Sequence, residues 1–383
     1  MGWILPSENA PRLQPVFSQP KGSNGAESLD AKDVVPDRLR IAVTVDPEIP
    51  VPPKHYGGIE RIVEMLVNGL IARGHRVTLF AHSSSSVPCR LIPYSSARHY
   101  GASQFVRNMI DITFELRSGR YDLIHSFGRL GYLLPMLRAP VPKIMSYQRT
   151  ITDRSVFWGT RLSRGTLHFT GCSRSLISRW DNRRNWHVVY NGVPMNRYTP
   201  RYEVSGDAPL LFVGRLERIK GVHMAIDVAR RSARRLIIAG NVPDGEEHRH
   251  FFETQIEPQL DGSTVTYMGP VDDADKNRLL GQAAALLMPV LWDEPFGIVM
   301  AEALACGTPV VGLNRGAIPE VIEDGVNGYV CSTPEEMVFA VSKIDQLDRR
   351  TCRRVMEDRF SDRAVVGGYE SLYRQVLAEA RAS

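Results

Sequence analysis

Short apolar runs alternate with longer amphipathic stretches from about residue 38 to the end of the chain. In the first half, strand-like runs lie at 40–45, 76–81, 121–125, 143–147, 168–172 and 187–190, with helical patterns at 59–73, 102–118 and 174–182. In the second half, strand-like runs lie at 210–213, 236–239, 265–267, 286–288, 309–311 and 329–330. This alternation predicts an α/β fold of doubly wound parallel sheets, which bind ligands at the carboxyl ends of their strands.

The pattern restarts near residue 200, so two Rossmann-like domains are expected. A chain of 383 residues is also too long for one compact core. We assign residues 38–200 to the N-terminal domain and 201–360 to the C-terminal domain, followed by a helix with an apolar stripe in 361–383. Residues 1–37, rich in Pro, Ser, Asn and Gly, are expected to be a disordered tail without catalytic role.

Charge is divided unevenly between the two halves. Residues 38–200 hold 23 Lys and Arg against 9 Asp and Glu, a balance of +14, whereas residues 201–383 hold 21 against 28, a balance of −7. Such an asymmetry bears on partners rather than on fold. It predicts that the N-terminal domain contacts something anionic, either a phosphorylated molecule or the negatively charged inner face of a membrane. A generic arginine-rich surface explains it equally well, and no motif accompanies it that would indicate nucleic acid.

Cysteine usage and hydropathy indicate the cellular compartment of the protein. The five cysteines are scattered and show no Cys/His ligand spacing, which favours a reducing cytoplasm and speaks against a zinc site or disulfide framework. No apolar run approaches the roughly 20 residues of a membrane span. Residues 1–6 lack the basic start of a signal peptide. We therefore expect a cytoplasmic protein.

The most informative segment runs Glu294-Pro-Phe-Gly-Ile-Val-Met-Ala-Glu302, which we call the clamp segment. It joins a buried strand to a helix, and Gly297 falls at the helix start, where free amides stabilise phosphate or electron-rich oxygen. Ionised carboxylates accept hydrogen bonds from paired hydroxyls, so Glu294 suits sugar hydroxyls and Glu302 a ribose. The glutamate spacing alone is far more often explained by two carboxylates that cap and solubilise a helix.

With Pro-Phe-Gly after the first glutamate and Ala-Cys-Gly-Thr-Pro-Val after the second, the segment resembles the signature of retaining family 4 glycosyltransferases of the GT-B fold. The resemblance spans about residues 38–380. Pro-Pro-x-x-Tyr-Gly-Gly, Trp292 and Arg-Gly-Ala-x-Pro-Glu are similar to a subgroup that includes avilamycin-pathway transferases. The family resemblance implies that the last helix crosses back to the N-terminal domain. It also implies donor contacts from Glu294, Phe296, Gly297, Ile298, Val299 and Glu302.

Two cations open the C-terminal domain in Gly214-Arg215-Leu-Glu-Arg-Ile-Lys220-Gly221. Arg supplies a planar fork and Lys a point charge, so the pair can hold a diphosphate and stabilise the charge that builds on it as it leaves. By itself the segment reads as a solvated basic loop. Its match to the family's Gly-Arg and Lys-Gly spacing favours a catalytic role for Arg215 and Lys220.

Two features of the N-terminal domain resemble the family's acceptor side. Gly57 and Gly58 lie between the first strand and a helix, where glycines let a ligand approach the backbone, although such a pair is also common in ordinary turns. His125 follows an apolar strand, where members of the family carry a histidine that faces the transferred sugar. An isolated histidine is more often a packed or surface residue. We predict that His125 positions a sugar hydroxyl.

These features together indicate a retaining hexosyltransferase that moves a sugar from a UDP- or GDP-sugar to a hydroxyl acceptor, with an anionic or lipid-linked acceptor favoured. No Asp-x-Asp cluster demands a metal ion, so no metal and no cofactor are expected. The family implies a front-face displacement in which the leaving phosphate helps to deprotonate the acceptor. A GT-B nucleotide-sugar epimerase and a non-catalytic nucleotide-sugar-binding protein remain alternatives.

Overall fold

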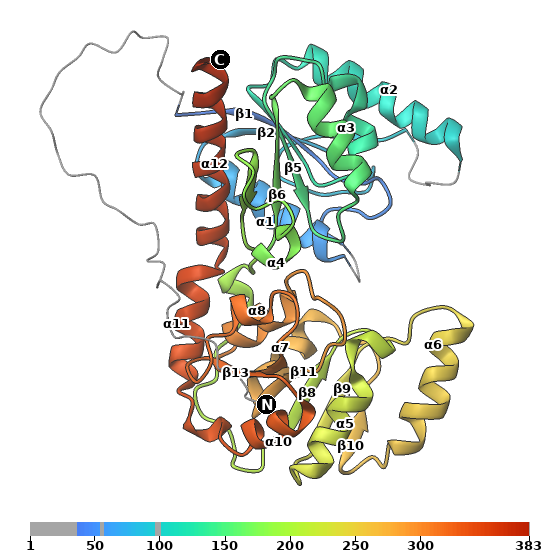
Figure 1. The fold of residues 1–383 in the computed structure, drawn as a ribbon, viewed down its shortest axis with the longest axis vertical. Coiled ribbons are helices and arrows are strands. Elements are labelled where there is room, and N and C mark those ends of the chain that lie inside the picture. Colours follow the sequence, from blue (N-terminus) through green and yellow to red (C-terminus); the bar gives the residue numbers. More distant parts are fainter. Residues whose placement is uncertain (1–36, 54–56, 96–100, 383) are drawn as a thin grey trace, which may run out of the picture. The chain divides into compact units, whose positions relative to one another are not determined.

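The computed structural model describes residues 37–53, 57–95 and 101–382, so the predicted tail, apart from Asp37, lies outside the described residues. The first half of the chain forms a parallel sheet of seven strands in the order β3-β2-β1-β4-β5-β6-β7. Figure 1 labels β1, β2, β5 and β6 of this sheet. The strands are β1 (Arg40–Thr44), β2 (Arg76–Ala81), β3 (Arg90–Pro93), β4 (Leu123–Ser126), β5 (Lys143–Tyr147), β6 (Leu167–Gly171) and β7 (Trp186–Val188).

The second half forms a parallel sheet of six strands in the order β10-β9-β8-β11-β12-β13. The strands are β8 (Leu210–Val213), β9 (Leu236–Ala239), β10 (Val265–Tyr267), β11 (Ala285–Met288), β12 (Val310–Leu313) and β13 (Gly328–Cys331). In both sheets the chain starts near the middle, runs to one edge, and returns to build the other. These two sheets confirm the predicted two-domain α/β architecture.

Helices connect the strands of both sheets, as the alternating pattern predicts. In the first half they are α1 (Gly58–Ala72), α2 (Ala102–Ser118), η1 (Leu130–Met136), α3 (Asp153–Ser163), α4 (Arg174–Ile177) and η2 (Met195–Arg197). In the second half they are η3 (Arg218–Lys220), α5 (Val222–Arg231), α6 (Glu246–Phe251), η4 (Phe252–Ile256), η5 (Glu257–Gln259), α7 (Asp273–Gln282), α8 (Ile298–Ala305), α9 (Ile318–Val321), α10 (Pro334–Val341), η6 (Ile344–Gln346), α11 (Arg349–Arg359) and α12 (Asp362–Ala382).

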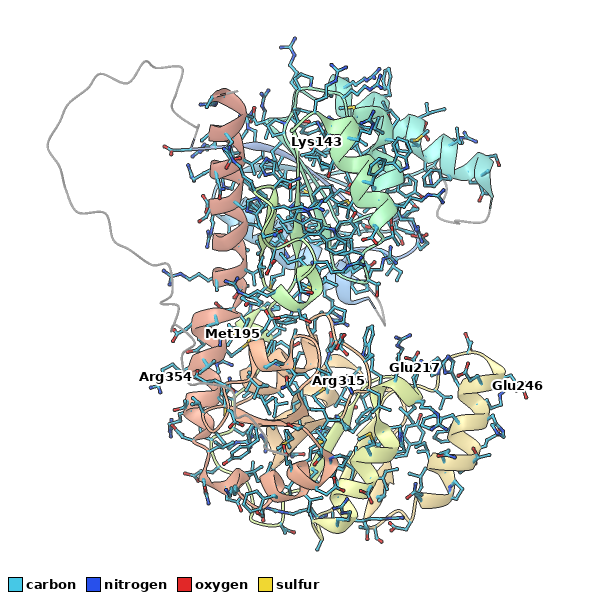
Figure 2. All side chains as sticks on the ribbon, in the orientation of Figure 1. Lys143, Met195, Glu217, Glu246, Arg315 and Arg354 are labelled. Atoms are coloured by element: carbon cyan, nitrogen blue, oxygen red, sulfur yellow. The ribbon has the colours of Figure 1, made fainter. Side chains whose placement is uncertain are left out.

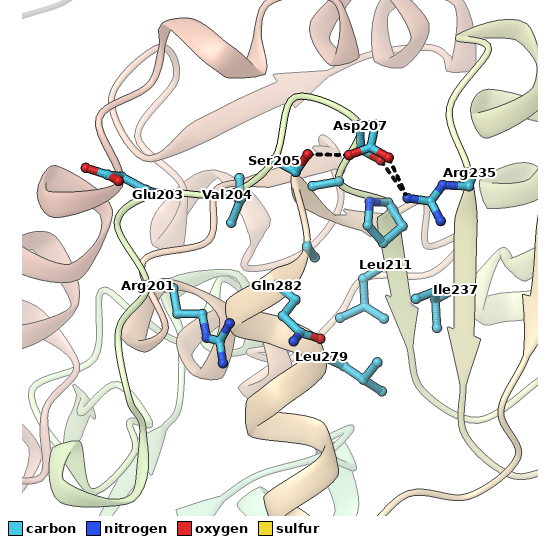
Figure 3. Close-up of a pocket in the computed structure, with 13 residues that line it drawn as sticks. Arg201, Glu203, Val204, Ser205, Asp207, Leu211, Arg235, Ile237, Leu279 and Gln282 are labelled. Atoms are coloured by element: carbon cyan, nitrogen blue, oxygen red, sulfur yellow. Dashed lines mark hydrogen bonds and ion pairs between the residues drawn. The ribbon is translucent and has the colours of Figure 1, made fainter.

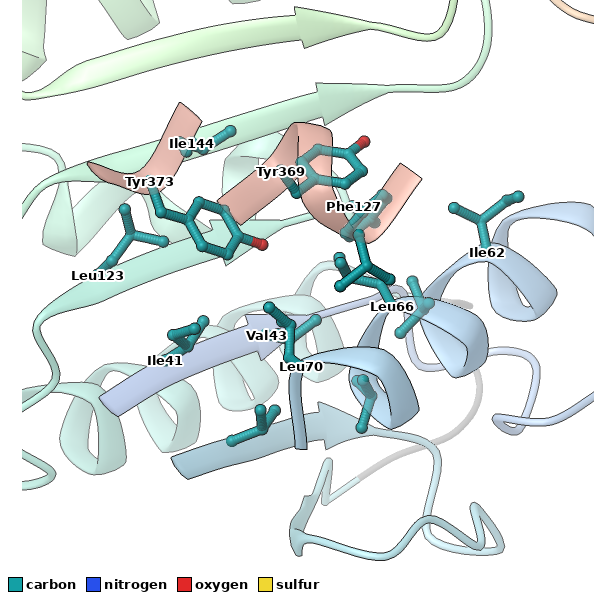
Figure 4. Close-up of a cluster of buried hydrophobic side chains, with 14 of the residues drawn as sticks. Ile41, Val43, Ile62, Leu66, Leu70, Leu123, Phe127, Ile144, Tyr369 and Tyr373 are labelled. Atoms are coloured by element: carbon teal, nitrogen blue, oxygen red, sulfur yellow. The ribbon is translucent and has the colours of Figure 1, made fainter. Parts of the chain in front are cut away.

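The last helix, α12, is part of the core of the first half of the chain. Its Tyr369 and Tyr373 are almost fully buried and share a cluster with Ile41 and Val43 of β1 and with the apolar face of α1 (Figure 4). Val366 packs directly over Gly69 of α1, where a Cβ would lie 2.4 Å from a valine methyl. The apolar stripe of α12 is thus buried against α1 and β1.

Three local features differ from the elements expected from the sequence. The edge strand β3 and the helix α3 were not predicted, and the helix predicted over 174–182 ends at Ile177. Strand β3 pairs only with β2 and is partly exposed, so it lacks the continuous apolar run of a buried parallel strand. Helix α3 is mostly exposed, so its weak apolar face gives little periodic signal.

Candidate active site

Loops that follow neighbouring strands of the second sheet carry most of the predicted donor residues. Arg215 and Lys220 follow β8, the clamp segment follows β11, and Arg315 follows β12. Because β8, β11 and β12 are adjacent and parallel, their carboxyl ends lie at one edge of the sheet. Figure 2 labels Glu217 and Arg315 on two of these loops. The fold therefore gathers segments that are about 100 residues apart in the sequence.

A close backbone approach at Gly221 fixes the position of Lys220. Gly221 has a φ of 76° and begins α5, and a Cβ on it would lie 1.9 Å from the carbonyl oxygen of Pro289. The amide of Leu291 also donates to the carbonyl of Ile219 at 2.8 Å. Only glycine allows this contact, because it has no Cβ and adopts a positive φ without strain. The loop after β8 is thereby held against the loop after β11.

Lys220 and Glu294 form a direct ion pair as a result. The Nζ of Lys220 lies 2.6 Å from Oε2 of Glu294, and both side chains are largely buried. The indole Nε1 of Trp292 donates to the same oxygen at 3.0 Å, and the Lys220 ammonium lies 4.6 Å from the centre of the Trp292 ring. A buried charge requires such partners, since an unpaired carboxylate there would be strongly destabilised.

The loop after β12 supports the backbone of Glu294 from another side. The carbonyl of Glu294 accepts from the amide of Ala317 at 2.8 Å. A Cβ on Gly316 would lie 2.3 Å from the amide nitrogen of Glu294, and Gly316 has a φ of 57°. The structure shows that Gly316 is the position where packing demands glycine.

The remaining clamp residues form the start of α8. Gly297 has a φ of 72° and is the N-cap, and no side chain caps the first amides in the described residues. Ile298 and Val299, the first two residues of α8, are half-buried. Phe296 differs: its ring is buried and packs edge-on against Phe360 at 5.7 Å. The side chain of Phe296 therefore stabilises the core, and only its backbone is available for the predicted donor contact.

The glycine loop of the first half lies next to the start of α8. A Cβ on Gly58 would lie 3.4 Å from Cδ1 of Ile298. Gly57 is the N-cap of α1 and is also without a side-chain cap. Residues 54–56 of this loop lie outside the described residues. Two helix starts, those of α1 and α8, therefore meet at the predicted boundary between acceptor and donor. The start of α1 carries the buried Glu60 carboxylate, so the start of α8 is the one that favours an anionic group.

Glu302 lies in the second turn of α8 and is only 4% exposed. Its Oε1 accepts a hydrogen bond from the Tyr198 hydroxyl at 2.8 Å and lies 2.6 Å from Nζ of Lys276. Burial, together with the negative charge of Glu302, raises the pKa of Tyr198, so this hydroxyl keeps its proton and donates. Tyr198 and Lys276 were not singled out from the sequence, because each lies far along the chain from Glu302.

Arg215 lies beside an acidic neighbour in its own loop. Its Nη1 is 2.8 Å from Oε1 of Glu217, whose side chain is buried, while the guanidinium is about one-third exposed. The second carboxylate oxygen, Oε2 of Glu217, is buried without a hydrogen-bond partner in the described residues. Glu217 therefore holds Arg215 on the loop after β8, where a planar guanidinium can meet a diphosphate.

His125 lies away from these loops, within the core under α12. The side chain is fully buried, with Nδ1 2.6 Å from the Tyr373 hydroxyl and Nε2 2.6 Å from the Ser146 hydroxyl. Burial lowers the pKa of His125 to about 3, so the ring is neutral. Positioning a sugar hydroxyl needs a free ring nitrogen, and both are engaged here. The role of His125 in positioning a sugar hydroxyl therefore stays a prediction, and it requires Tyr373 or Ser146 to release one ring nitrogen.

A separate groove lies at the amino-terminal ends of the strands of the second sheet, opposite the carboxyl ends that carry the candidate site (Figure 3). Its volume is about 330 Å³, and Leu211, Ile237 and Leu279 form its apolar floor, with Arg235 paired to Asp207 at its rim. These residues lie near the amino ends of β8 and β9. None of the predicted site residues lines this groove, so it is not part of the candidate active site.

Two further properties concern metals and membranes. Within the described ranges, no group of three or more His, Cys, Asp or Glu side chains is arranged to hold a metal ion. Among the described helices, none has both the length and the hydropathy to cross a bilayer.

Family models match both halves of the chain. The model described as Glycosyltransferase Family 4 matches residues 56–197, and the model described as Glycosyl transferases group 1 matches residues 201–357. The chain belongs to the family 4 glycosyltransferases of the GT-B fold. This confirms the family and the fold class predicted from the clamp segment and the strand pattern, and it makes the protein a glycosyltransferase.

Individual relatives agree with this assignment over most of their length. Spore coat protein SA of Bacillus subtilis is 24% identical over 358 residues, which cover 85% of this chain and 94% of the relative. The crystal structure of AviGT4, a glycosyltransferase involved in avilamycin A biosynthesis, has a TM-score of 0.67 at 24% identity and covers 89% of this chain and 98% of its own. Anabaena HepE in complex with UDP-glucose has a TM-score of 0.66 at 17% identity, with 88% and 99% covered. At these identities the structural likeness speaks for the fold.

Proposed function

We propose that this GT-B glycosyltransferase is a retaining hexosyltransferase that uses a nucleoside-diphosphate sugar as donor. The observation that carries the proposal is the meeting of Lys220 and Glu294 beside the uncapped start of α8. A cation for the diphosphate, a carboxylate for sugar hydroxyls and free amides for an electron-rich oxygen are thereby gathered at one sheet edge. The complex of the structurally similar Anabaena HepE with UDP-glucose supports a donor of this class.

Most of the predicted site residues have a role in this proposal. Arg215 and Lys220 bind the diphosphate and stabilise the charge that grows on it as the sugar leaves. Glu294 and the amides of 297–299 bind the sugar, and Glu302 binds the ribose. The loop at Gly57 and Gly58 borders the acceptor, which attacks on the same face from which the leaving phosphate departs.

The ion pair of Lys220 and Glu294 also satisfies two largely buried charges. Each side chain neutralises the other at 2.6 Å. A diphosphate carries more negative charge than one carboxylate and competes for the Lys220 ammonium. Trp292 continues to donate to Oε2 of Glu294, so the carboxylate keeps its orientation while it accepts sugar hydroxyls. Because two cations supply the positive charge, we propose that the chemical step requires no metal ion.

The stereochemistry is tested by proton NMR of the sugar released from an α-linked donor. A retaining enzyme releases the α-anomer first, before mutarotation, and its rate is unchanged after treatment with EDTA. Initial release of the β-anomer would contradict retention, and loss of turnover with EDTA would contradict metal independence. Formation of an isomeric nucleotide sugar without acceptor would instead indicate the epimerase alternative.

We further propose that the acceptor is lipid-linked or otherwise anionic and that the cytoplasmic enzyme reaches it at an anionic membrane surface. Helix α2 exposes Val106, Ile110 and Phe114, which are four residues apart and so form one stripe. Arg107 and Arg117 are exposed on the same helix. An exposed apolar stripe flanked by cations, in a half of the chain with a balance of +14, fits the interfacial region of an anionic bilayer.

Vesicle co-sedimentation tests this contact. The wild type is expected to bind vesicles that contain anionic lipid, with binding reduced by salt, and not neutral vesicles. Replacing Ile110 and Phe114 together by Ser should reduce the bound fraction at least about fivefold. Phe339→Ser, which removes an exposed aromatic side chain from α10, is the matched control. Equal binding by the double variant and the control would contradict this part of the proposal.

A further inference from the structure

The two clamp glutamates are held in the same way. Glu294 receives the Lys220 ammonium and the Trp292 indole on Oε2, at 2.6 and 3.0 Å. Glu302 receives the Lys276 ammonium and the Tyr198 hydroxyl on Oε1, at 2.6 and 2.8 Å. In both cases a lysine and a neutral aromatic donor meet on one carboxylate oxygen. In the described part of the chain, the other oxygen of each glutamate has no hydrogen-bond donor.

We propose that Lys276 and Tyr198 are positioning residues that hold Glu302 so that its Oε2 accepts the hydroxyls of a nucleotide ribose. The inference rests on the proposed function, because it assumes that a nucleoside diphosphate binds beside α8. It adds a specificity determinant to that site. The pair makes the enzyme distinguish a ribose from a sugar that lacks these hydroxyls.

Burial explains why Glu302 needs both partners. A carboxylate that is 4% exposed is costly to ionise unless a cation neutralises it and donors satisfy its oxygens. Without Lys276, the Glu302 carboxylate would lose the cation that balances its charge in this buried place. The hydrogen bond from Tyr198 approaches the same oxygen from a second direction, so the carboxylate group of Glu302 cannot rotate freely about its Cγ–Cδ bond. With both donors on Oε1, the remaining oxygen keeps a fixed direction.

Two side chains of α1, Arg61 and Glu64, form ion pairs that restrain the segments carrying Lys276 and Tyr198. Lys276 lies 3.4 Å from Asp273, and Asp273 pairs with Arg61 of α1 at 2.6 Å. Burial acts to raise the pKa of Asp273, but the hydrogen bond from Arg61 and the charge of Lys276 leave it below its usual value. Tyr198 directly follows Arg197, which pairs with Glu64 of α1 at 2.5 Å.

Helix α1 thus restrains both partners of Glu302, and it begins at the Gly57 and Gly58 loop. The ribose side of the site is therefore connected to the acceptor side through two charge pairs. Since Glu302 itself is on α8, this arrangement joins elements of both halves of the chain around a single carboxylate.

Calorimetric titration with ribose and 2′,3′-dideoxyribose forms of the same nucleoside diphosphate tests the proposal. UDP, GDP and ADP are first titrated into the wild type, and the tightest is compared with its dideoxy form. We expect the wild type to bind the ribose form at least about tenfold more tightly, since hydrogen bonds to a charged group are worth this much. Lys276→Met should weaken the ribose form about tenfold and leave the dideoxy form nearly unchanged. Tyr198→Phe should show the same pattern more weakly.

Lys343→Met is the matched control, because it removes the same charge from the second half of the chain. The Lys343 ammonium lies 4.0 Å from the centre of the Phe339 ring, and its loss should leave the ribose preference intact. Equal weakening of both nucleotide forms by Lys276→Met, or a wild type without ribose preference, would overturn the inference while nucleotide binding persists. If Lys276→Met fails to fold, Tyr198→Phe decides alone. Failure of the wild type to bind any of the three would contradict the proposed function and this inference with it.

Discussion

At the scale of single residues, each buried glutamate of the clamp segment is paired with a lysine. Glu294 and Lys220 neutralise each other, and Glu302 is neutralised by Lys276. A buried carboxylate needs such a partner, since an unpaired charge there would be strongly destabilising. In the proposed donor site each pair would share its charge with the donor, so binding would exchange one set of ionic contacts for another.

The residues that form these charge pairs could be predicted only in part from the sequence. Glu294, Glu302, Arg215 and Lys220 stand in motifs with characteristic neighbours, so their type and spacing are visible in the chain. Lys276 is 26 residues and Tyr198 is 104 residues from Glu302, and no local pattern connects them. His125 shows the converse: its place at a strand end is visible, whereas the burial by α12 that engages both ring nitrogens is a tertiary effect.

His125 predicts a loss of stability in acid. Its pKa falls from about 6.5 in the unfolded chain to about 3 in the folded protein, so the unfolded state binds the extra proton between these values. The free energy of unfolding should therefore decrease as pH falls below about 6.5, by about 2 kcal/mol from this residue at pH 5.

Urea unfolding from pH 7.5 to 4.5 measures this contribution. In His125→Asn, which cannot take up the proton, the decrease should be smaller by about that amount. His250→Asn, at an exposed site on α6, should retain the pH dependence of the wild type. A His125→Asn variant with the full acid destabilisation would contradict the buried neutral ring.

At the scale of secondary structure, short loops and helix starts place the functional groups. Helices α5 and α8 both begin at a glycine with positive φ, Gly221 and Gly297. Such glycines let the chain turn sharply from a strand end into a helix, so that side chains and amides lie at the sheet edge. The clamp segment and the Lys-Gly pair were predicted from their resemblance to the family's motifs, and these glycines are part of those motifs.

Gly221→Ala tests how strongly the β8 loop depends on this approach. The added Cβ would lie 1.9 Å from the Pro289 carbonyl oxygen, so the loop that carries Lys220 must move. We expect the variant to lose about 3 kcal/mol of stability in urea unfolding and to bind the donor less tightly.

Gly262→Ala provides the matched control. Gly262 has a similar φ of 71°, but a Cβ there meets nothing within 4 Å. This variant therefore carries the backbone strain without the collision and should lose only about 1 kcal/mol. Equal destabilisation by the two substitutions would show that the contact with Pro289 does not hold the loop.

At the scale of the whole molecule, the described chain consists of two parallel sheets, and the returning helix α12 completes the first core. The architecture was predictable because buried parallel strands are apolar on both faces and appear as distinct short runs. The division of the chain near residue 200 falls between η2 and β8. Edge strand β3 and the exposed helix α3 escaped prediction because neither buries enough surface to impose a pattern.

The arrangement of the strands also explains why the clamp segment alone indicates the position of the whole candidate donor site. Strands β8, β11 and β12 bring three loops to one edge, and each loop contributes part of the candidate donor site. Ile298 of the clamp segment lies against Gly58, so the same edge meets the glycine loop of the first half. A site assembled in this way needs both halves of the chain, which agrees with family matches in both.

The most direct test of the central claim is a nucleotide-sugar panel, read by thermal shift and slow donor hydrolysis, with wild type, Glu294→Gln and Lys220→Met compared. One donor should raise the melting temperature of the wild type and be hydrolysed, and both variants should lose turnover about 100-fold. Glu247→Gln, at an exposed position on α6, should behave as the wild type. If no nucleotide sugar binds, or if Glu294→Gln hydrolyses the donor at the wild-type rate, the proposed donor site is contradicted.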